Sequence, residues 1–360
     1  MHTRECFVSA PGKAILHGEH AVVHGKVALA VSLNLRTYLR LQSTSSCKVC
    51  INLPNIDTFL SWEITALQRL LVGCKELGDL KELDADLLKR LREFTGISDG
   101  STDTRSMAVL AFLYIYLSVF AEAEENISSP LTPQQESARW SKEEMELINR
   151  WALMGEKIIH GNPSGVDNAV GTWGGILRYH AGNITPLSRV PVLRILLTNT
   201  KVPRSTKVLV SGVKDKINKF PSVMNPVLES VNAVSCTCEH TLTEMATHGP
   251  SAEHYTVLEE LIDINQHHLN VMGVGHSSLD TLCRVTLARG LHSKLTGAGG
   301  GGCGITLLRP EMDASVIQST IEELKGYGFE CWETSIGAPG VQMHSPTAVK
   351  QGILKILNSY

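Results

Sequence analysis

The chain has 360 residues, of which 43% are hydrophobic and 19% are charged, a composition typical of a soluble globular protein. This length exceeds what one hydrophobic core usually supports, so we expect two domains. A net charge of −3 and a pI near 6.5 give no electrostatic reason to expect nucleic acid or an anionic membrane as a partner.

Cysteine use and hydropathy predict a cytoplasmic protein. The nine cysteines, an odd number spread along a long chain, are typical of reduced thiols. Cys47/Cys50 and Cys236/Cys238 would form one zinc site only if distant segments met, so we expect none. The most apolar run, 107–120, is too short to span a bilayer, so we expect a buried helix and no membrane insertion. A peroxisomal location stays open, although the terminal Asn-Ser-Tyr is not a Ser-Lys-Leu-type signal.

Strand patterns dominate the first sixty residues, and helical patterns follow them. The polar stretch 122–139 has no apolar periodicity and predicts a loop. Ser141 followed by Glu144 is a capping-box signature, which predicts the start of a long helix that runs to residue 160. Two prolines flank a polar turn at 183–191, where we expect a break between domains. The other expected strands are 27–33, 35–41, 49–53, 173–179, 192–198 and 328–335, with a strand–loop–strand unit at 292–308, and the other expected helices are 61–78, 83–95, 104–120, 204–219, 222–246, 255–270, 277–289 and 313–326.

Residues 9–20 form the first segment with a chemical signature, Ser-Ala-Pro-Gly-Lys-Ala-Ile-Leu-His-Gly-Glu-His. Pro11 and Gly12 are typical of a turn between two strands, which would bring Lys13 to the surface of a cleft. A point charge, a carboxylate and two imidazoles within eight residues suit the binding of an oxyanion beside a hydroxylated substrate. These groups are Lys13, His17, Glu19 and His20, and their spacing does not match a zinc-protease helix.

Residues 155–168 form the second segment, Gly-Glu-Lys-Ile-Ile-His-Gly-Asn-Pro-Ser-Gly-Val-Asp-Asn. We expect a helix to end at Gly161 and a tight turn to present Asp167. Two carboxylates near one turn, Glu156 and Asp167, suit phosphoryl transfer, in which one holds Mg²⁺ and the other orients or accepts the proton of the attacking hydroxyl. On this segment alone the alternative is equally open: Asp167 caps the next element and Glu156 is a solvated helix residue.

Residues 294–304 form the third segment, Lys-Leu-Thr-Gly-Ala-Gly-Gly-Gly-Gly-Cys-Gly, which runs into an apolar strand. Glycines let the backbone approach a ligand and point several N–H groups at an anion. The Walker pattern is absent, and the dinucleotide fingerprint lacks its acidic residue. A crowded tight turn between two strands is the alternative interpretation.

In this order and spacing, the three segments resemble the GHMP small-molecule kinases and, within that superfamily, the mevalonate kinase family. Residues 197–204 and 259–270 share the likeness, which runs from about residue 6 to 345. The resemblance implies an α+β fold of two domains. Residues 1–187 would form a ribosomal-S5-like α/β domain, and residues 188–360 a ferredoxin-like α+β domain whose tail can pack back on the first.

The resemblance also implies an activity: ATP- and Mg²⁺-dependent phosphorylation of mevalonate to 5-phosphomevalonate, a step in isoprenoid and sterol synthesis. It implies a homodimer as well, and prenyl diphosphates as feedback inhibitors. By position, Asp167 matches the catalytic base, Lys13 the group that stabilises the transition state and contacts ATP, and Glu156 the Mg²⁺ ligand. The remaining expected site residues are Asn55 for the nucleotide, Glu19, His20 and Thr206 for the substrate, and Gly297, Gly299, Gly300, Gly301 and Gly302 in the glycine loop.

One motif of the family is missing. The family carries Pro-x-x-x-Gly-Leu-Gly-Ser-Ser-Ala-Ala, a strand, a phosphate-binding loop and a helix, in the interval where this chain has only the polar stretch 122–139. Such a unit has roughly 30 residues, so the first domain is expected to be incomplete. Loss of charge-assisted contacts worth about 1.5–3 kcal/mol each, together with uncovered apolar faces, predicts low turnover and low stability.

Two alternative functions stay open. The first is a non-catalytic variant that pairs with intact subunits, or binds isoprenoid diphosphates through residues 294–304, and so regulates them. The second is another GHMP kinase, acting for example on phosphomevalonate, galactose or homoserine, which the His-Gly-Glu-His-Ala-Val-Val-His stretch disfavours.

Overall fold

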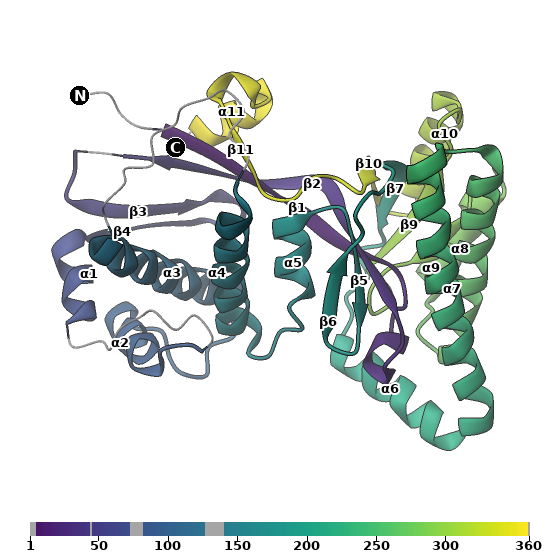
Figure 1. The fold of residues 1–360 in the computed structure, drawn as a ribbon, viewed down its shortest axis with the longest axis horizontal. Coiled ribbons are helices and arrows are strands. Elements are labelled where there is room, and N and C mark those ends of the chain that lie inside the picture. The colour runs from purple at the N-terminus through teal and green to yellow at the C-terminus, as the bar shows by residue number, and fades with distance from the viewer. Residues whose placement is uncertain (1–4, 44, 73–81, 127–139, 359–360) are drawn as a thin grey trace. The chain divides into compact units, whose positions relative to one another are not determined.

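The structure is a computed structural model that describes residues 5–43, 45–72, 82–126 and 140–358 (Figure 1). Contacts divide the chain into two compact units. Unit 1 comprises Met1–Ser9, Tyr38–Asn168 and Gln342–Tyr360, and unit 2 comprises Ala10–Thr37 and Ala169–Val341. This division differs from the ranges 1–187 and 188–360, because residues 10–37 and 169–187 belong to unit 2 and residues 342–360 belong to unit 1. The expected domain boundary therefore stays a prediction.

Among the described residues, the range 48–160 of unit 1 contains a β-hairpin followed by four α-helices. The hairpin pairs β3 (Lys48–Leu53) with β4 (Thr58–Glu63) in antiparallel register. The helices are α1 (Ile64–Leu71), α2 (Ala85–Thr95), α3 (Thr104–Asn126) and α4 (Lys142–His160). They bury a common apolar core that includes Val49, Leu67, Leu87, Leu91, Leu110, Leu113, Leu117, Trp151 and Met154.

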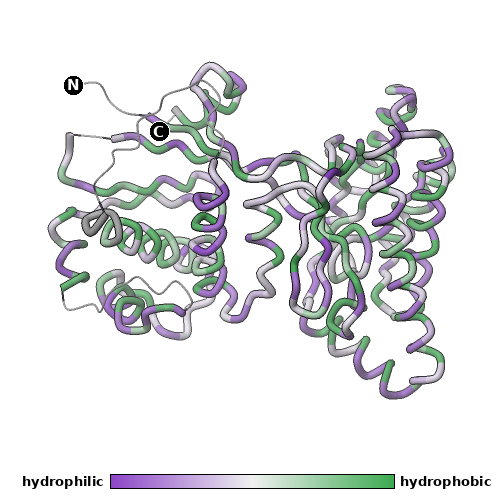
Figure 2. The backbone as a smooth tube through the Cα atoms, in the orientation of Figure 1, coloured by the Kyte–Doolittle hydropathy of each residue, from purple (hydrophilic) through white to green (hydrophobic). Residues whose placement is uncertain are grey.

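Helix α3 contains a long apolar stretch, which Figure 2 colours as hydrophobic. At 23 residues it is longer than the expected 104–120, and its window Thr104–Ala121 is long and apolar enough to cross a membrane. However, 44% of that window is buried inside the protein, where α3 packs against α1, α2 and α4. Helix α3 is therefore the core helix of unit 1, in agreement with the sequence-based prediction of a buried helix.

The strands of unit 2 form one antiparallel sheet. Counted from β1 (Glu5–His17), its order is β1–β2–β10–β7–β9–β8, and β5 pairs with both β2 and β6. The bounds are β2 (Ala28–Gln42), β5 (Ile176–His180), β6 (Asn183–Pro186), β7 (Leu193–Asn199), β8 (Ser293–Leu295), β9 (Cys303–Leu308) and β10 (Glu330–Ile336).

The helices of unit 2 are α5 (Val166–Trp173), which begins in unit 1, α6 (Thr206–Lys219), α7 (Pro221–His248), α8 (Ala252–Met272), α9 (Ser277–Leu287) and α10 (Ala314–Gly326). Strand β7 shows how they meet the sheet. Ile195 and Leu197 pack in one core with α7 and α8, whereas Leu196 between them packs in another core with α9 and α10. This alternation follows from the two-residue period of a strand.

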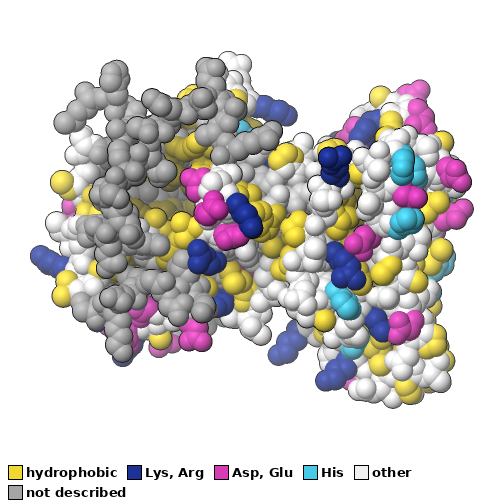
Figure 3. Space-filling model, in the orientation of Figure 1, with side chains coloured by type: hydrophobic (Ala, Val, Ile, Leu, Met, Phe, Trp, Pro, Cys, Tyr) yellow, Lys and Arg dark blue, Asp and Glu magenta, His cyan; other side chains and the backbone are white. Residues whose placement is uncertain are grey.

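Strand β1 (Glu5–His17) passes from unit 1 into unit 2, as does β2. Its residues 7–9 pair with β11 (Gln342–His344) near the C-terminus, and α11 (Gln351–Asn358) follows. Short 3-10 helices occur at η1 (Ala21–His24), η2 (Pro54–Ile56) and η3 (Pro346–Ala348). On the face shown in Figure 3, charged side chains of both signs are interspersed over unit 2, as a net charge of −3 would suggest.

Most of the expected elements are present. The capping box is confirmed, since Ser141 Oγ accepts from Glu144 N at 3.1 Å and Glu144 Oε2 accepts from Ser141 N. The expected strands 27–33 and 35–41 form the single strand β2, and the expected helix 61–78 begins only after β4. The end of that helix and most of the stretch 122–139 lie outside the described residues.

The expected turn at Pro11 and Gly12 is wrong, because both residues lie inside β1. A β-carbon at Gly12 would lie 3.4 Å from Leu35 O and 3.7 Å from Leu33 Cβ, so Gly12 approaches β2 closely. Glycine inside a strand often marks such a close approach, and proline is tolerated in a strand where its missing N–H is not needed for pairing. Long-range pairing has overridden the local turn preference here.

Candidate active site

Lys13 is half-buried and lies on β1 within unit 2. Two residues further on, β1 is attached to the loop after β8. Ile15 N donates to Thr296 Oγ1 at 3.0 Å, and Thr296 Oγ1 donates to Ile15 O at 2.8 Å. The backbone N–H and C=O of Ile15 therefore hold the strand that carries Lys13 against the start of the glycine loop.

Glu19 is completely buried and forms an ion pair with Lys294, which is completely buried as well. Its second carboxylate oxygen accepts from Asn265 Nδ2 at 3.0 Å. Burial raises the pKa of Glu19 above its usual value, and the neighbouring Lys294 ammonium opposes this shift. Both oxygens of Glu19 therefore have partners inside the protein. The expected contact of Glu19 with the substrate stays a prediction.

His20 links the same segment to the glycine loop. Its Nε2 lies 2.8 Å from Ala298 O and donates to it, and its Nδ1 is buried with no hydrogen-bond partner among the described residues. The backbone of His20 has a φ of +60°, a conformation that costs a residue other than glycine about 1–3 kcal/mol. The surrounding contacts hold this strained residue in place.

The glycine loop, residues 296–302, connects β8 and β9 in an antiparallel hairpin, as expected for residues 292–308. Gly299 has a φ of +75°, and a β-carbon there would lie 2.2 Å from Val274 O. Not every loop amide can face a ligand: Gly300 N donates to Val274 O at 2.8 Å, and Gly302 N donates to Val202 O at 3.1 Å. The loop is therefore both a crowded turn and a candidate anion site.

A cation lies beside this loop. A β-carbon at Gly302 would be only 1.1 Å from Nη1 of Arg204, so the guanidinium lies directly against the loop backbone. Thr206, two residues later, is exposed at the start of α6, which Ser205 caps by accepting from Val208 N. A guanidinium next to a glycine-rich turn favours an anionic ligand.

The other expected site residues belong to unit 1. Asn55 is exposed in η2, between β3 and β4. Glu156 is half-buried on α4, and Asp167 is exposed in the first turn of α5. The turn between these helices is anchored by Asn168, whose Nδ2 donates to Asn149 Oδ1 of α4 at 2.7 Å.

No group of three or more His, Cys, Asp or Glu side chains in the described ranges could hold a metal ion. Mg²⁺ does not need such a group, because it commonly uses one or two carboxylates together with substrate phosphates and water. A single half-buried carboxylate such as Glu156 therefore fits a Mg²⁺ ion that enters with a nucleotide.

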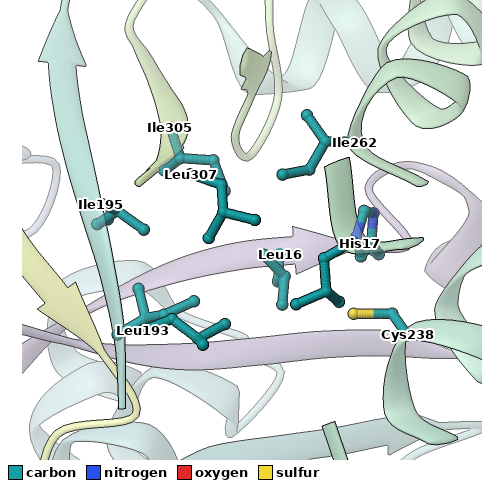
Figure 4. Close-up of a pocket in the computed structure, with 10 residues that line it drawn as sticks. Leu16, His17, Leu193, Ile195, Cys238, Ile262, Ile305 and Leu307 are labelled. Atoms are coloured by element: carbon teal, nitrogen blue, oxygen red, sulfur yellow. The ribbon is translucent and has the colours of Figure 1, made fainter. Parts of the chain in front are cut away.

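A cavity in the core of unit 2 is not a candidate site. Its volume of about 10 Å³ is at the lower limit for one water molecule. The lining side chains are apolar apart from His17 and Cys238, and Figure 4 shows residues such as Leu16 and Leu307 around the gap. Burial and the nearby Lys294 charge lower the pKa of His17 well below its usual value, so this imidazole stays neutral.

Within unit 2, the structure brings the segment 13–20 together with residues 294–298. Lys13 and Asp167 lie in different units, and their separation stays a prediction. Sequence reasoning missed the roles of Lys294, Asn265 and Arg204. One signal was present: Asn265 and Gln266 are polar residues on a face of α8 whose neighbours Leu258, Leu261, Ile262 and Leu269 are apolar and buried.

Comparisons with known proteins give consistent matches. Residues 252–325 match the family model described as "GHMP kinases C terminal". The mevalonate kinases of Bos taurus and Homo sapiens are each 51% identical to this chain, over 98% of this chain and 98% of the relative. The alignment with the bovine protein spans 389 positions, which is more than the 360 residues of this chain. Some residues of the bovine protein therefore have no counterpart in this chain.

Solved structures agree on the fold. The L. major mevalonate kinase in complex with R-mevalonate has a TM-score of 0.57 at 17% identity, covering 92% of this chain and 96% of that chain. The Methanococcus jannaschii mevalonate kinase has a TM-score of 0.59 at 19% identity, covering 94% and 98%. At this identity the likeness concerns the fold alone, and it confirms the expected α+β GHMP kinase fold.

Proposed function

Because this chain belongs to the mevalonate kinase family of the ATP-dependent GHMP kinases, we propose that it transfers the γ-phosphoryl group of ATP to the primary hydroxyl of mevalonate. The observation that carries this proposal is the 51% identity over nearly the whole length of two mevalonate kinases. The alternative of a different GHMP kinase has no comparable support.

Phosphoryl transfer passes through a loose transition state, so the protein mainly positions the reactants and neutralises charge. We assign the neutralising cation to Lys13, whose strand is fixed to the glycine loop through Ile15 and Thr296. We assign the base to Asp167, where an exposed carboxylate in a helical turn can accept the proton of the attacking hydroxyl. Both assignments follow the positions implied by the resemblance.

The remaining ligand contacts are proposed on the same ground. Glu156 would hold Mg²⁺, which supplies charge neutralisation at the phosphates when it is bound. Asn55 would contact the nucleotide, and His20 and Thr206 would contact mevalonate. Arg204 beside Gly302 adds a cation at the glycine loop. Dimerisation, feedback inhibition by prenyl diphosphates and a cytoplasmic location stay predictions.

A second candidate function has its own supporting observation. The sequence lacks the phosphate-loop motif of the family, and its alignment with the bovine relative contains positions where this chain has no residue. Without that loop, ATP would lose several charge-assisted contacts of about 1.5–3 kcal/mol each. A chain that binds mevalonate or an intact subunit, but hardly turns over, is the alternative outcome.

A direct assay separates the two candidates. The 360-residue chain is incubated with mevalonate, Mg²⁺ and ATP labelled with ³²P in the γ-phosphate, and the labelled 5-phosphomevalonate is quantified. Parallel reactions contain galactose, homoserine or phosphomevalonate in place of mevalonate as the acceptor. We expect slow but mevalonate-dependent product formation, lowered about a hundredfold or more in Lys13→Met and Asp167→Asn. Lys48→Met, an exposed lysine on β3, is the control that should keep the original rate.

If the original chain forms product no faster than the Asp167→Asn variant, the catalytic proposal is contradicted. Co-purification with an intact family member and a change in that member's rate would then support the second candidate.

A further inference from the structure

Three sets of contacts join two segments of unit 2 that are far apart in the sequence. Ile15 exchanges two hydrogen bonds with Thr296, Glu19 pairs with Lys294, and His20 donates to Ala298 O. The partners are between 275 and 281 residues apart along the chain. Together they hold the end of β1 and the following turn against the hairpin that carries the glycine loop.

The middle contact is an ion pair with no exposure to solvent. Lys294 and Glu19 both have 0% side-chain exposure, and Lys294 Nζ also donates to Leu295 O at 2.7 Å. Burial lowers the pKa of Lys294, whereas the Glu19 carboxylate opposes that shift. A buried charge is retained only when a partner and hydrogen bonds compensate its lost hydration.

Helix α8 extends this network to a third element. Asn265 donates to Glu19, and its neighbour Gln266 accepts from Leu295 N at 2.8 Å. The amide nitrogen of Gln266, Nε2, donates to Asn270 Oδ1 at 3.0 Å. The ionisable groups that face Lys294 come from β1, α7 and α9 as well as from the turn after β1: His17, Cys238, Cys283 and Glu19.

We propose that Lys294 is a positioning residue: its buried pair with Glu19, oriented by Asn265, fixes the register between the Lys13-bearing strand and the glycine loop. These contacts disfavour any other register between β1 and the hairpin of β8 and β9. A shift of one segment along the other would separate the charges of Lys294 and Glu19 inside the protein. The side chains of Lys294 and Glu19 have no exposed surface, so in this proposal they act through Lys13, His20 and the loop. This inference deepens the proposed function and rests on it only for its catalytic meaning.

Hydrogen exchange tests the positioning role without needing turnover. The double variant Glu19→Gln/Lys294→Met removes both charges and keeps similar side-chain volumes. We expect exchange in peptides covering 13–20 and 294–304 to accelerate roughly tenfold or more, while peptides of α7 keep the original rate. Lys26→Met/Glu229→Gln, which removes a more exposed ion pair of the same unit, is the matched control and should change neither segment.

A second variant covers the case in which the double variant does not fold. Asn265→Ala leaves the ion pair in place but removes one donor from Glu19, and we expect the same two segments to exchange faster by a smaller factor. Unchanged exchange in both segments of a folded variant, or equal acceleration throughout unit 2, would overturn the positioning role.

Mevalonate titration of the same variants adds the link to function. We expect the affinity to weaken roughly tenfold in the buried double variant and to stay constant in the surface double variant. An unaltered affinity beside altered exchange would refute the claim that the pair positions the site. Absence of mevalonate binding to the original chain would contradict the proposed function instead, and the exchange result would still decide the structural claim.

Discussion

The two units hold their expected site residues in different ways. In unit 2, Glu19 and His20 are buried and bonded to residues 294–298 by side-chain contacts that need no ligand, although Lys13 is half-buried and Thr206 is exposed. In unit 1, Asn55 and Asp167 are exposed and Glu156 is half-buried. This part of unit 2 is therefore preorganised. The residues expected to contact the nucleotide and Mg²⁺ in unit 1 are less enclosed, and the sequence contains no Gly-Leu-Gly-Ser-Ser motif.

This difference separates the binding of the two substrates. In unit 2, both oxygens of Glu19 and the amide of Gln266 are hydrogen-bonded, although His20 Nδ1 and Asn265 Oδ1 have no partner among the described residues. Buried polar networks of this kind make a site rigid, and rigid sites bind at a lower entropic cost. Charge-assisted contacts to phosphates, by contrast, must be supplied by particular backbone amides and side chains. The comparison predicts that the mevalonate contacts expected in unit 2 survive in this chain. It also predicts that the nucleotide and Mg²⁺ contacts expected in unit 1, and with them the contact of Lys13 with ATP, are impaired.

The largest expected effect comes from restoring the missing motif. Residues 121–139 are replaced by the corresponding segment of the bovine relative, which is 51% identical overall. Two or three regained contacts of about 1.5–3 kcal/mol each predict a rate gain of about a hundredfold or more. The rate of phosphomevalonate formation measures this gain. The control is the same chimera in which Gly-Leu-Gly-Ser-Ser is changed to Gly-Leu-Gly-Ala-Ala. Equal rates for the chimera and the original chain would refute the assignment.

The buried ion pair should have the next largest effect, on stability. Removing one partner leaves an uncompensated charge, so Lys294→Met and Glu19→Gln should each lower the free energy of unfolding by about 3–5 kcal/mol. The double variant should lose much less, because no charge stays buried alone. Urea unfolding at neutral pH measures all three, and additive losses in the double variant would argue against the pairing.

The two single variants should also differ in the sign of their pH dependence. In Lys294→Met, the pKa of Glu19, already raised by burial, rises further, so the free energy of unfolding falls as pH rises above about 4.5. In Glu19→Gln, the pKa of Lys294, already lowered by burial, falls further, so the free energy of unfolding rises as pH rises towards 10.5. Parallel slopes between pH 5 and 9 would rule out this account.

A smaller effect is expected at the glycine loop. Gly299→Ala places a β-carbon 2.2 Å from Val274 O at a φ of +75°, which should destabilise unit 2 by about 3 kcal/mol. Gly212→Ala on α6 is the control, because nothing lies within 4 Å of its β-carbon and alanine favours a helix. Thermal unfolding should show opposite changes for the two variants, and similar changes would contradict the strained-loop interpretation.

The smallest expected effect lies in unit 1. Ser141→Ala removes the cap of α4 and should lower the free energy of unfolding by about 1 kcal/mol. Denaturation followed by tryptophan fluorescence, to which the buried Trp151 of α4 contributes, would detect it. Ser141→Asp supplies another capping oxygen and should recover most of the loss, and equal stability of all three proteins would show that the cap contributes nothing.

Local signals predicted much of the fold. Apolar periodicity indicated α6 to α10, and the Ser141–Glu144 pair, three residues apart, predicted the start of α4. Long-range contacts could not be predicted in this way. Pro11 and Gly12 follow turn preferences in the sequence but lie in a strand, because β1 extends alongside β2. The Lys294–Glu19 pair joins residues 275 apart, so no local pattern could reveal it.

Calorimetric titration of the 360-residue chain, with mevalonate and separately with MgATP, tests the comparison between the units most directly. The account predicts saturable binding of mevalonate and no saturation by MgATP at micromolar concentrations. Micromolar affinity for MgATP would contradict it, and so would the absence of any mevalonate binding.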